Sequence, residues 1–136
     1  MTPLEKLKEV VLAAVPDFTN NILLGCGRIP EEFLEENSTK LPSCYISWDG
    51  FDTDNRYENG RPSPAGFTER CKIYIRVAKN AQVDIRQHVQ AIRNYVNTQT
   101  TLFDDDGARR DIKITSGFAE RDDKIGDRFT LDIIIH

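Results

Sequence analysis

The strongest constraint on the fold is a run of alternating residues from Cys71 to Val77. Its apolar side chains recur at every second position, and lysine, tyrosine and arginine stand between them. Successive side chains of a β-strand point to opposite faces of a sheet, so this period of two predicts a strand with one buried face. The polar face is exposed to solvent or contacts a polar partner. The apolar face must be covered by another layer of the fold.

Two amphipathic helices are predicted in addition to this strand. The first begins with the capping-box residues Thr2 and Glu5 and ends at Pro16. The second covers residues 82–96, where isoleucine and valine recur at helical spacing along one side. His88 lies on the second helix but off its apolar stripe.

Further strands precede and follow the second helix. In the last of them, Ile134 shares a face with Asp132, so we expect that face to be covered near the end of the chain by another element or another subunit. Gly117 is expected to break the strand before it. The predicted strands cover residues 22–24, 43–48, 112–114 and 129–135.

This order of elements predicts an α+β fold. Runs of strands between two helices indicate a single, mainly antiparallel or mixed β-sheet with two helices packed on one face. The chain has 136 residues, a length that suits one domain over residues 1–136.

Residues 49–66 form the longest stretch without periodicity, and they are rich in turn-forming glycine, asparagine and proline. Asn59-Gly60 is a favoured pair for a tight turn, so we expect a long β-hairpin loop. Connections of this length are usually functional or disordered. Phe51, Tyr57 and Phe67 lie within or beside this polar stretch, which suggests that they are buried against a neighbouring subunit.

Composition argues against several classes of protein. The formal net charge of −4 disfavours an overall basic nucleic-acid footprint. Cys26, Cys44 and Cys71 are odd in number and widely spaced, so we expect reduced thiols, with Cys44 and Cys71 in the core. The chain begins without a signal-peptide pattern and has no apolar run of about 20 residues, so we expect a soluble, cytosolic protein with no membrane partner.

The sequence offers little for catalysis. No G-x-S-x-G, H-E-x-x-H, P-loop or C-x-x-C motif occurs. Acidic clusters at Asp52 and Asp54, at residues 104–106, and at Asp122 and Asp123 are the candidates for a Mg²⁺ site. Solvated turns or subunit contacts are the preferred explanation for them. We therefore expect no enzymatic activity, no metal and no cofactor.

Three segments then stand in a characteristic order. They are Leu41-Pro42 before the strand at residues 44–48, the long polar loop before the strand at residues 71–77 and its helix, and a terminal module of Gly117-Phe118, Arg121-Asp122-Asp123 and an apolar strand. This order, over about residues 3–136, resembles the tail terminator proteins of long-tailed bacteriophages and prophages. The loop at residues 49–66 is longer than is usual for that family.

The resemblance implies a structural protein of the virion, at the head-proximal end of the tail, assembled in the cytoplasm of a bacterial host. A hexameric ring of this chain would cap the tail tube, stop its polymerisation and provide the docking surface for the head or neck connector. The implied partners are other copies of the chain, the major tail tube protein and the head-completion connector. DNA would pass through without specific binding, and an acidic total suits such a channel because like charges repel.

Two groups of residues are the candidate contacts with other subunits, the neck or the tube. One lies in the long loop, and the other is the charged turn before the last strand, where mixed charge suits polar contacts that set register. A solvated β-turn is the alternative for the second group. The candidates are Phe51, Asp52, Asp54, Arg56, Tyr57 and Phe67, and Glu120, Arg121, Asp122, Asp123 and Lys124.

Three other functions stay open at this point. Another small head–tail connector, neck or tail-completion subunit would have a similar fold. A metal-dependent nuclease or other hydrolase would depend on Asp122 and Asp123. A small ligand-binding or regulatory α+β module would require an apolar pocket.

Overall fold

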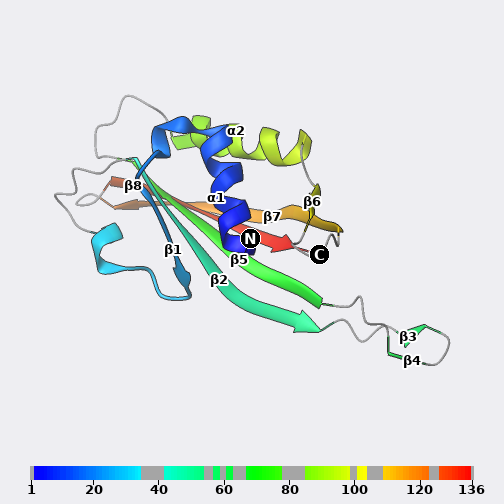
Figure 1. Cartoon of the computed structure of the whole chain (residues 1–136). Helices are drawn as coiled ribbons and strands as arrows, with labels where there is room; N and C mark the ends of the chain where they lie inside the picture. Colours follow the sequence, from blue (N-terminus) through cyan, green and yellow to red (C-terminus); the bar gives the residue numbers. More distant parts are fainter. Residues whose placement is uncertain are drawn as a thin grey trace.

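The computed structural model describes residues 2–34, 42–53, 57–58, 61–62, 67–77, 85–98, 101–103, 109–122 and 126–135. Two α-helices, α1 (Pro3–Ala14) and α2 (Ile85–Thr98), lie on one face of a β-sheet, as Figure 1 shows. The predicted α+β fold is therefore confirmed. Within this described part of the chain, neither helix is long and apolar enough to cross a membrane.

The sheet is mixed and mainly antiparallel, as predicted. Among the described residues it has six strands in the order β1–β2–β5–β8–β7–β6, and only β1 and β2 pair in parallel. A separate pair of short strands, β3 and β4, lies beyond it. The bounds are β1 (Ile22–Cys26), β2 (Ser43–Thr53), β3 (Tyr57–Glu58), β4 (Arg61–Pro62), β5 (Phe67–Arg76), β6 (Thr101–Phe103), β7 (Arg109–Asp122) and β8 (Gly126–Ile135), with 3-10 turns η1 (Pro16–Phe18) and η2 (Glu31–Leu34).

The capping box of α1 is confirmed. The Glu5 N–H donates to Thr2 Oγ1 at 3.3 Å, and the Thr2 N–H donates to Glu5 Oε2 at 3.0 Å. These two bonds satisfy backbone donors that a helix start leaves unpaired. The second predicted helix is found at α2, and residues 82–84 of that prediction lie outside the described residues.

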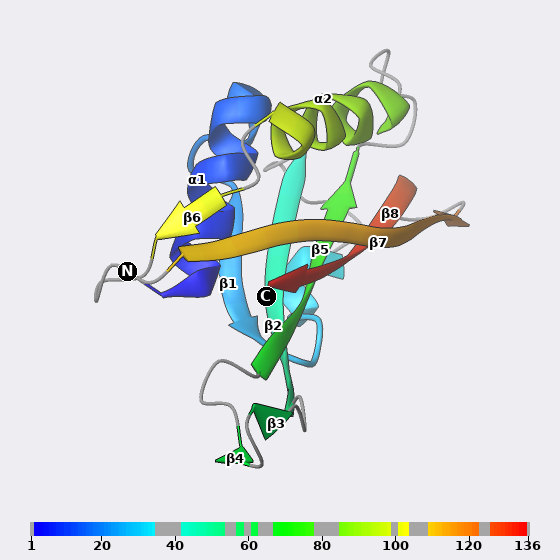
Figure 2. The same cartoon turned by 90° about the vertical axis from the view of Figure 1, so that its right-hand side faces the viewer.

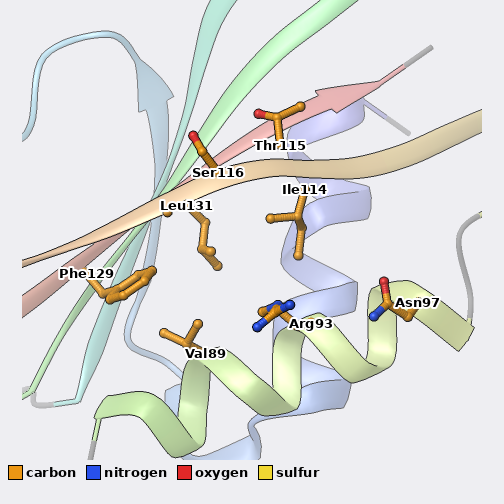
Figure 3. A pocket seen from close by; sticks show the side chains of 9 residues that line it. Val89, Arg93, Asn97, Ile114, Thr115, Ser116, Phe129 and Leu131 are labelled. Carbon is orange, nitrogen blue, oxygen red and sulfur yellow. The ribbon is translucent and has the colours of Figure 1, made fainter.

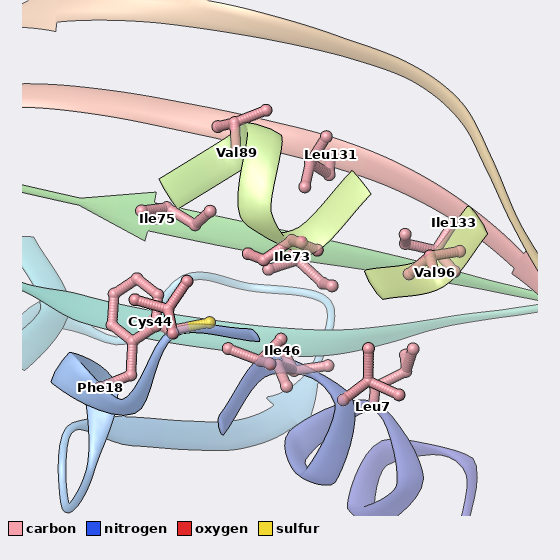
Figure 4. Packing of buried hydrophobic residues seen from close by; sticks show 14 of the residues in the cluster. Leu7, Phe18, Cys44, Ile46, Ile73, Ile75, Val89, Val96, Leu131 and Ile133 are labelled. Atoms are coloured by element: carbon pink, nitrogen blue, oxygen red, sulfur yellow. The ribbon is translucent and has the colours of Figure 1, made fainter. Parts of the chain in front are cut away.

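The core fills the space between the two helices and the sheet (Figure 4). Alternate residues of the central strands point toward the helices, so Ile46, Ile73 and Leu131 are all buried there. Cys44 and Cys71 are buried free thiols, as predicted, and burial raises the pKa of the Cys44 thiol.

His88 is also buried, although it lies off the apolar stripe of α2. Its ring centroid is 5.4 Å from that of Phe18. Position 88 flanks the stripe on the side where η1 packs, so tertiary contact covers a residue that the helical pattern alone leaves outside.

The prediction that Gly117 breaks its strand is wrong. Strand β7 continues through Gly117 to Asp122, after a register shift between Ile114 and Ser116. A Cβ atom on Gly117 would lie 2.7 Å from Cε1 of Phe129 on β8. The ring of Phe129 therefore occupies the space that a side chain at position 117 would need, and the glycine belongs inside the strand.

The prediction that residues 49–66 are irregular is wrong at residues 49–53, 57–58 and 61–62, which belong to β2, β3 and β4. β2 continues to Thr53 because a bulge between Trp48 and Gly50 is accommodated by Gly50, whose φ is +116°. Glu58 pairs with Arg61, and Asn59-Gly60, where the turn is expected, lie outside the described residues. Figures 1 and 2 show the β2–β5 pair projecting beyond the helices.

Candidate assembly interface

An aromatic patch continues the helix-facing side of the sheet onto the projecting end of the β2–β5 pair. Trp48 pairs with the core residue Cys71, and Phe51 pairs with Glu69 across the two strands. The rings of Trp48 and Phe51 lie 6.5 Å apart, and Trp48 Nε1 donates to Glu69 Oε1 at 3.2 Å. Phe51 is 56% exposed. We call Trp48, Phe51 and Glu69 the ribbon patch.

Another predicted contact residue, Asp52, lies beside Phe51 and is ion-paired. Its Oδ2 atom is 3.3 Å from Nε of Arg70, and both side chains are more than half exposed. Exposed pairs of this kind contribute about 0–1 kcal/mol, so this pair orders the surface more than it stabilises the fold.

The remaining predicted contacts of the long loop are only partly described. Asp54 and Arg56 lie outside the described residues. Tyr57 begins β3 and Phe67 begins β5, and only their backbones are described.

The described members of the second predicted group, Glu120, Arg121 and Asp122, are the last residues of β7 in the β7–β8 hairpin. Glu120 pairs with Arg128 across the hairpin and makes an ion pair with it. Arg121 and Asp122 continue the ladder opposite Asp127 and Gly126. The expected antiparallel strands on either side of the charged turn are thus confirmed, whereas contact with another subunit stays a prediction. Asp123 and Lys124 lie outside the described residues.

The structure does not bring the two predicted groups together. Figure 1 shows the projecting β2–β5 pair at one end of the sheet and the tip of the β7–β8 hairpin at the other. The chain therefore presents two different surfaces in two directions.

A groove that the sequence did not predict lies between α2 and the β7–β8 hairpin (Figure 3). It has a volume of about 320 Å³. Side chains of α2 point toward those of the two strands, and no local sequence pattern indicates this groove, because its walls come from a helix and a hairpin that are separate in the chain. We call it the α2 groove; its main lining residues are Val89, Arg93, Asn97, Ile114, Phe129 and Leu131.

Arg93 is the charged residue of the α2 groove. Its side chain is exposed, and no described residue forms a hydrogen bond or ion pair with it. An unpaired guanidinium beside apolar side chains favours a carboxylate from outside, because arginine and carboxylate form paired, charge-assisted hydrogen bonds.

The sheet face opposite the helices is partly covered by the segment after β1. The rings of Tyr45 and Tyr74 stack with centroids 5.7 Å apart, and Phe33 of η2 packs against Tyr45. Arg76 Nη1 donates to the Phe33 carbonyl at 2.7 Å. Burial raises the pKa values of Tyr45 and Tyr74.

The cover expected over Ile134 is partial. Ile134 is half-buried, and its pairing partners on the neighbouring strands are Arg70 and Lys113. Elsewhere on this face, Lys72 Nζ lies 3.9 Å from Asp49 Oδ2 and forms an ion pair with it.

Metal-binding geometry is absent from the described residues, where no three histidine, cysteine, aspartate or glutamate side chains gather around one point. No protein-family model matches the chain, and no curated protein is similar to it at a significant level. Function is therefore inferred from the fold, the exposed surfaces and the resemblance of the sequence.

Proposed function

We propose that this chain is a structural subunit that forms a ring on the end of a phage tail tube. The ring stops tube polymerisation and provides the docking surface for the head connector. No covalent bond is made or broken in this role. Besides the order of motifs in the sequence, one observation carries the proposal. The ribbon patch lies beyond the core at one end of the sheet, and the charged end of the β7–β8 hairpin lies at the other end (Figure 1).

Two unlike surfaces on one subunit favour head-to-tail association. Such a contact generates a closed ring when its rotation permits closure and a filament when it does not. An exposed aromatic residue such as Phe51 supplies the apolar centre that subunit contacts require. Mixed charges around it set the register of the contact.

The decisive experiment is electron microscopy of phage particles produced with and without this chain. Without it, we expect abnormally long tail tubes that lack heads. Adding purified chain during tube assembly should restore uniform length, and adding the Phe51→Ser variant should not. Tails of normal length joined to heads in the absence of the chain would contradict the proposal.

The order of addition separates a terminator from another neck subunit. A terminator binds isolated tubes before any head is present. Binding to isolated heads, with no binding to tubes, would assign the chain to the connector instead.

A further inference from the structure

We infer that the ribbon patch of one copy docks into the α2 groove of the next copy. This inference rests on the proposed ring and names the two surfaces that would join its subunits. It follows from three properties of the described residues: apolar complementarity, charge complementarity and the directions of the two surfaces.

The apolar parts of the two surfaces complement each other. Val89 and Leu131 are buried at the base of the groove, and Phe129 is half-buried beside them. Phe51 is more exposed than any other large apolar side chain among the described residues. An aromatic ring seated in an apolar pocket is the typical centre of a protein interface, because it removes much apolar surface from water.

Each surface also carries one charged group beside its apolar part, and the two charges have opposite signs. The ribbon patch places the Glu69 carboxylate opposite Phe51 on the neighbouring strand. One oxygen of that carboxylate accepts from Trp48 Nε1, and a carboxylate can accept several further hydrogen bonds. The groove places the Arg93 guanidinium beside Val89, one helical turn away. An aromatic ring with a carboxylate therefore meets an apolar hollow with an arginine.

A single copy cannot fill its own groove with this patch. Figure 2 shows α2 at the top of the molecule and the projecting ends of β2 and β5 at the bottom, so the two surfaces lie at opposite ends of these strands. The contact is therefore between copies and joins two different surfaces. Each copy presents one patch and one groove to its neighbours, so the contact can repeat until the ring closes.

Charge reversal tests the contact in a specific way. Glu69→Arg and Arg93→Glu each place like charges in the contact, so each variant alone should self-associate at least tenfold more weakly than the original chain. A 1:1 mixture should recover, because the two variants then alternate and every contact again joins opposite charges. Sedimentation velocity over a range of concentrations up to about millimolar measures the association constants.

Arg28→Glu is the matched control. Arg28 is exposed and lies on the segment after β1, away from the groove, and its substitution makes the same change in net charge as Arg93→Glu. It should leave association within about twofold. Glu69→Arg removes the hydrogen bond to Trp48 in both the single sample and the mixture, so recovery on mixing cannot come from that bond.

The outcomes separate the contact from the ring. If the original chain forms rings and neither reversal weakens them, or the mixture fails to recover, this contact is wrong and the proposed ring stands. If the original chain neither self-associates nor binds the ends of tail tubes, the contact and the proposed function are both wrong.

Discussion

At the scale of single residues, Arg76 shows how the surroundings change the role of a side chain. Strand alternation places it on the polar face of β5, where an arginine would ordinarily be solvated. In the structure it is 1% exposed, and it donates to the Phe33 carbonyl from beneath η2. A charged group that is hydrogen-bonded and buried ties the covering segment to the sheet.

Arg76→Ala should lower the free energy of unfolding by about 2–4 kcal/mol, because it leaves a cavity and an unpaired buried carbonyl. Urea denaturation of the purified chain measures the change. Arg93→Ala, at an exposed position, should change it by less than about 0.5 kcal/mol. Equal losses for the two variants would show that Arg76 does not anchor the segment.

The hydroxyl groups of Tyr45 and Tyr74 and the buried thiol of Cys44 predict a loss of stability at alkaline pH, where each group loses its proton. Burial raises the pKa of each above its ordinary range. Such a group contributes stability that is fully present below its unfolded-state pKa and is lost as the pH rises toward the folded-state pKa. In the unfolded chain the pKa values of cysteine and tyrosine are about 8.5 and 10, so the free energy of unfolding should fall from about pH 8.5 upward.

Urea denaturation at several pH values between about 7 and 11 checks this slope. Tyr45→Phe should make the decline above about pH 10 shallower, because phenylalanine has no proton to lose. At neutral pH the same variant should cost about 0.5–1.5 kcal/mol through the lost bond from the Tyr45 hydroxyl to the Arg28 carbonyl. A stability that stays constant or rises toward pH 11 would contradict the assignment.

At the scale of elements, the β7–β8 hairpin contains a glycine, Gly117, at which local propensity wrongly predicts the end of a strand. Gly117 is a strand breaker by propensity, yet it lies in the middle of a strand of 14 residues. The ring of Phe129 on the paired strand fills the adjacent space. The hairpin therefore extends past the core, carries the charged tip outward and forms one wall of the α2 groove.

Gly117→Ala should lower the free energy of unfolding by about 1–3 kcal/mol, because the new methyl group overlaps the ring of Phe129. Combining it with Phe129→Leu should recover part of the loss relative to the sum of the two single variants. A double-mutant cycle by urea denaturation measures this coupling. Strictly additive losses would show that the overlap does not occur.

At the scale of the whole molecule, the projecting end of the β2–β5 pair extends beyond the core that holds the fold together (Figure 1), whereas the α2 groove is lined by the core residues Val89 and Leu131. A residue that serves only association should therefore matter to assembly and not to folding. Under the proposed contact Phe51 is such a residue, and it lies outside the hydrophobic core and is 56% exposed.

Phe51→Ser should leave the thermal unfolding midpoint within about 2 °C of the original, because surface changes have small effects on stability. It should weaken self-association tenfold or more, as expected for a central aromatic contact. Phe118→Ser is the matched control, because Phe118 is 48% exposed but pairs with Thr130 on the sheet face opposite the helices. Equal weakening by both variants would remove the special role of Phe51.

Periodicity in the sequence identified both helices, the central strands and the α+β class, because burial on one face imposes a period of two or 3.6 locally. It also marked Phe51 as a contact candidate, since an aromatic residue in a polar stretch is visible without coordinates. The antiparallel strands on either side of the charged segment were predicted for the same reason, because their apolar alternation is a local pattern, although Glu120 and Asp122 belong to β7 itself.

Features that depend on distant partners were decided only by the tertiary structure. Gly117 fits inside a strand because the ring of Phe129 on β8 fills the space beside it. His88 is buried because Phe18 packs on it, and Arg76 is covered because η2 folds over it. The α2 groove has the same origin, since its walls come from a helix and a hairpin that are separate in the chain. Local sequence sets which faces are apolar, and long-range packing sets which of those faces remain open to a partner.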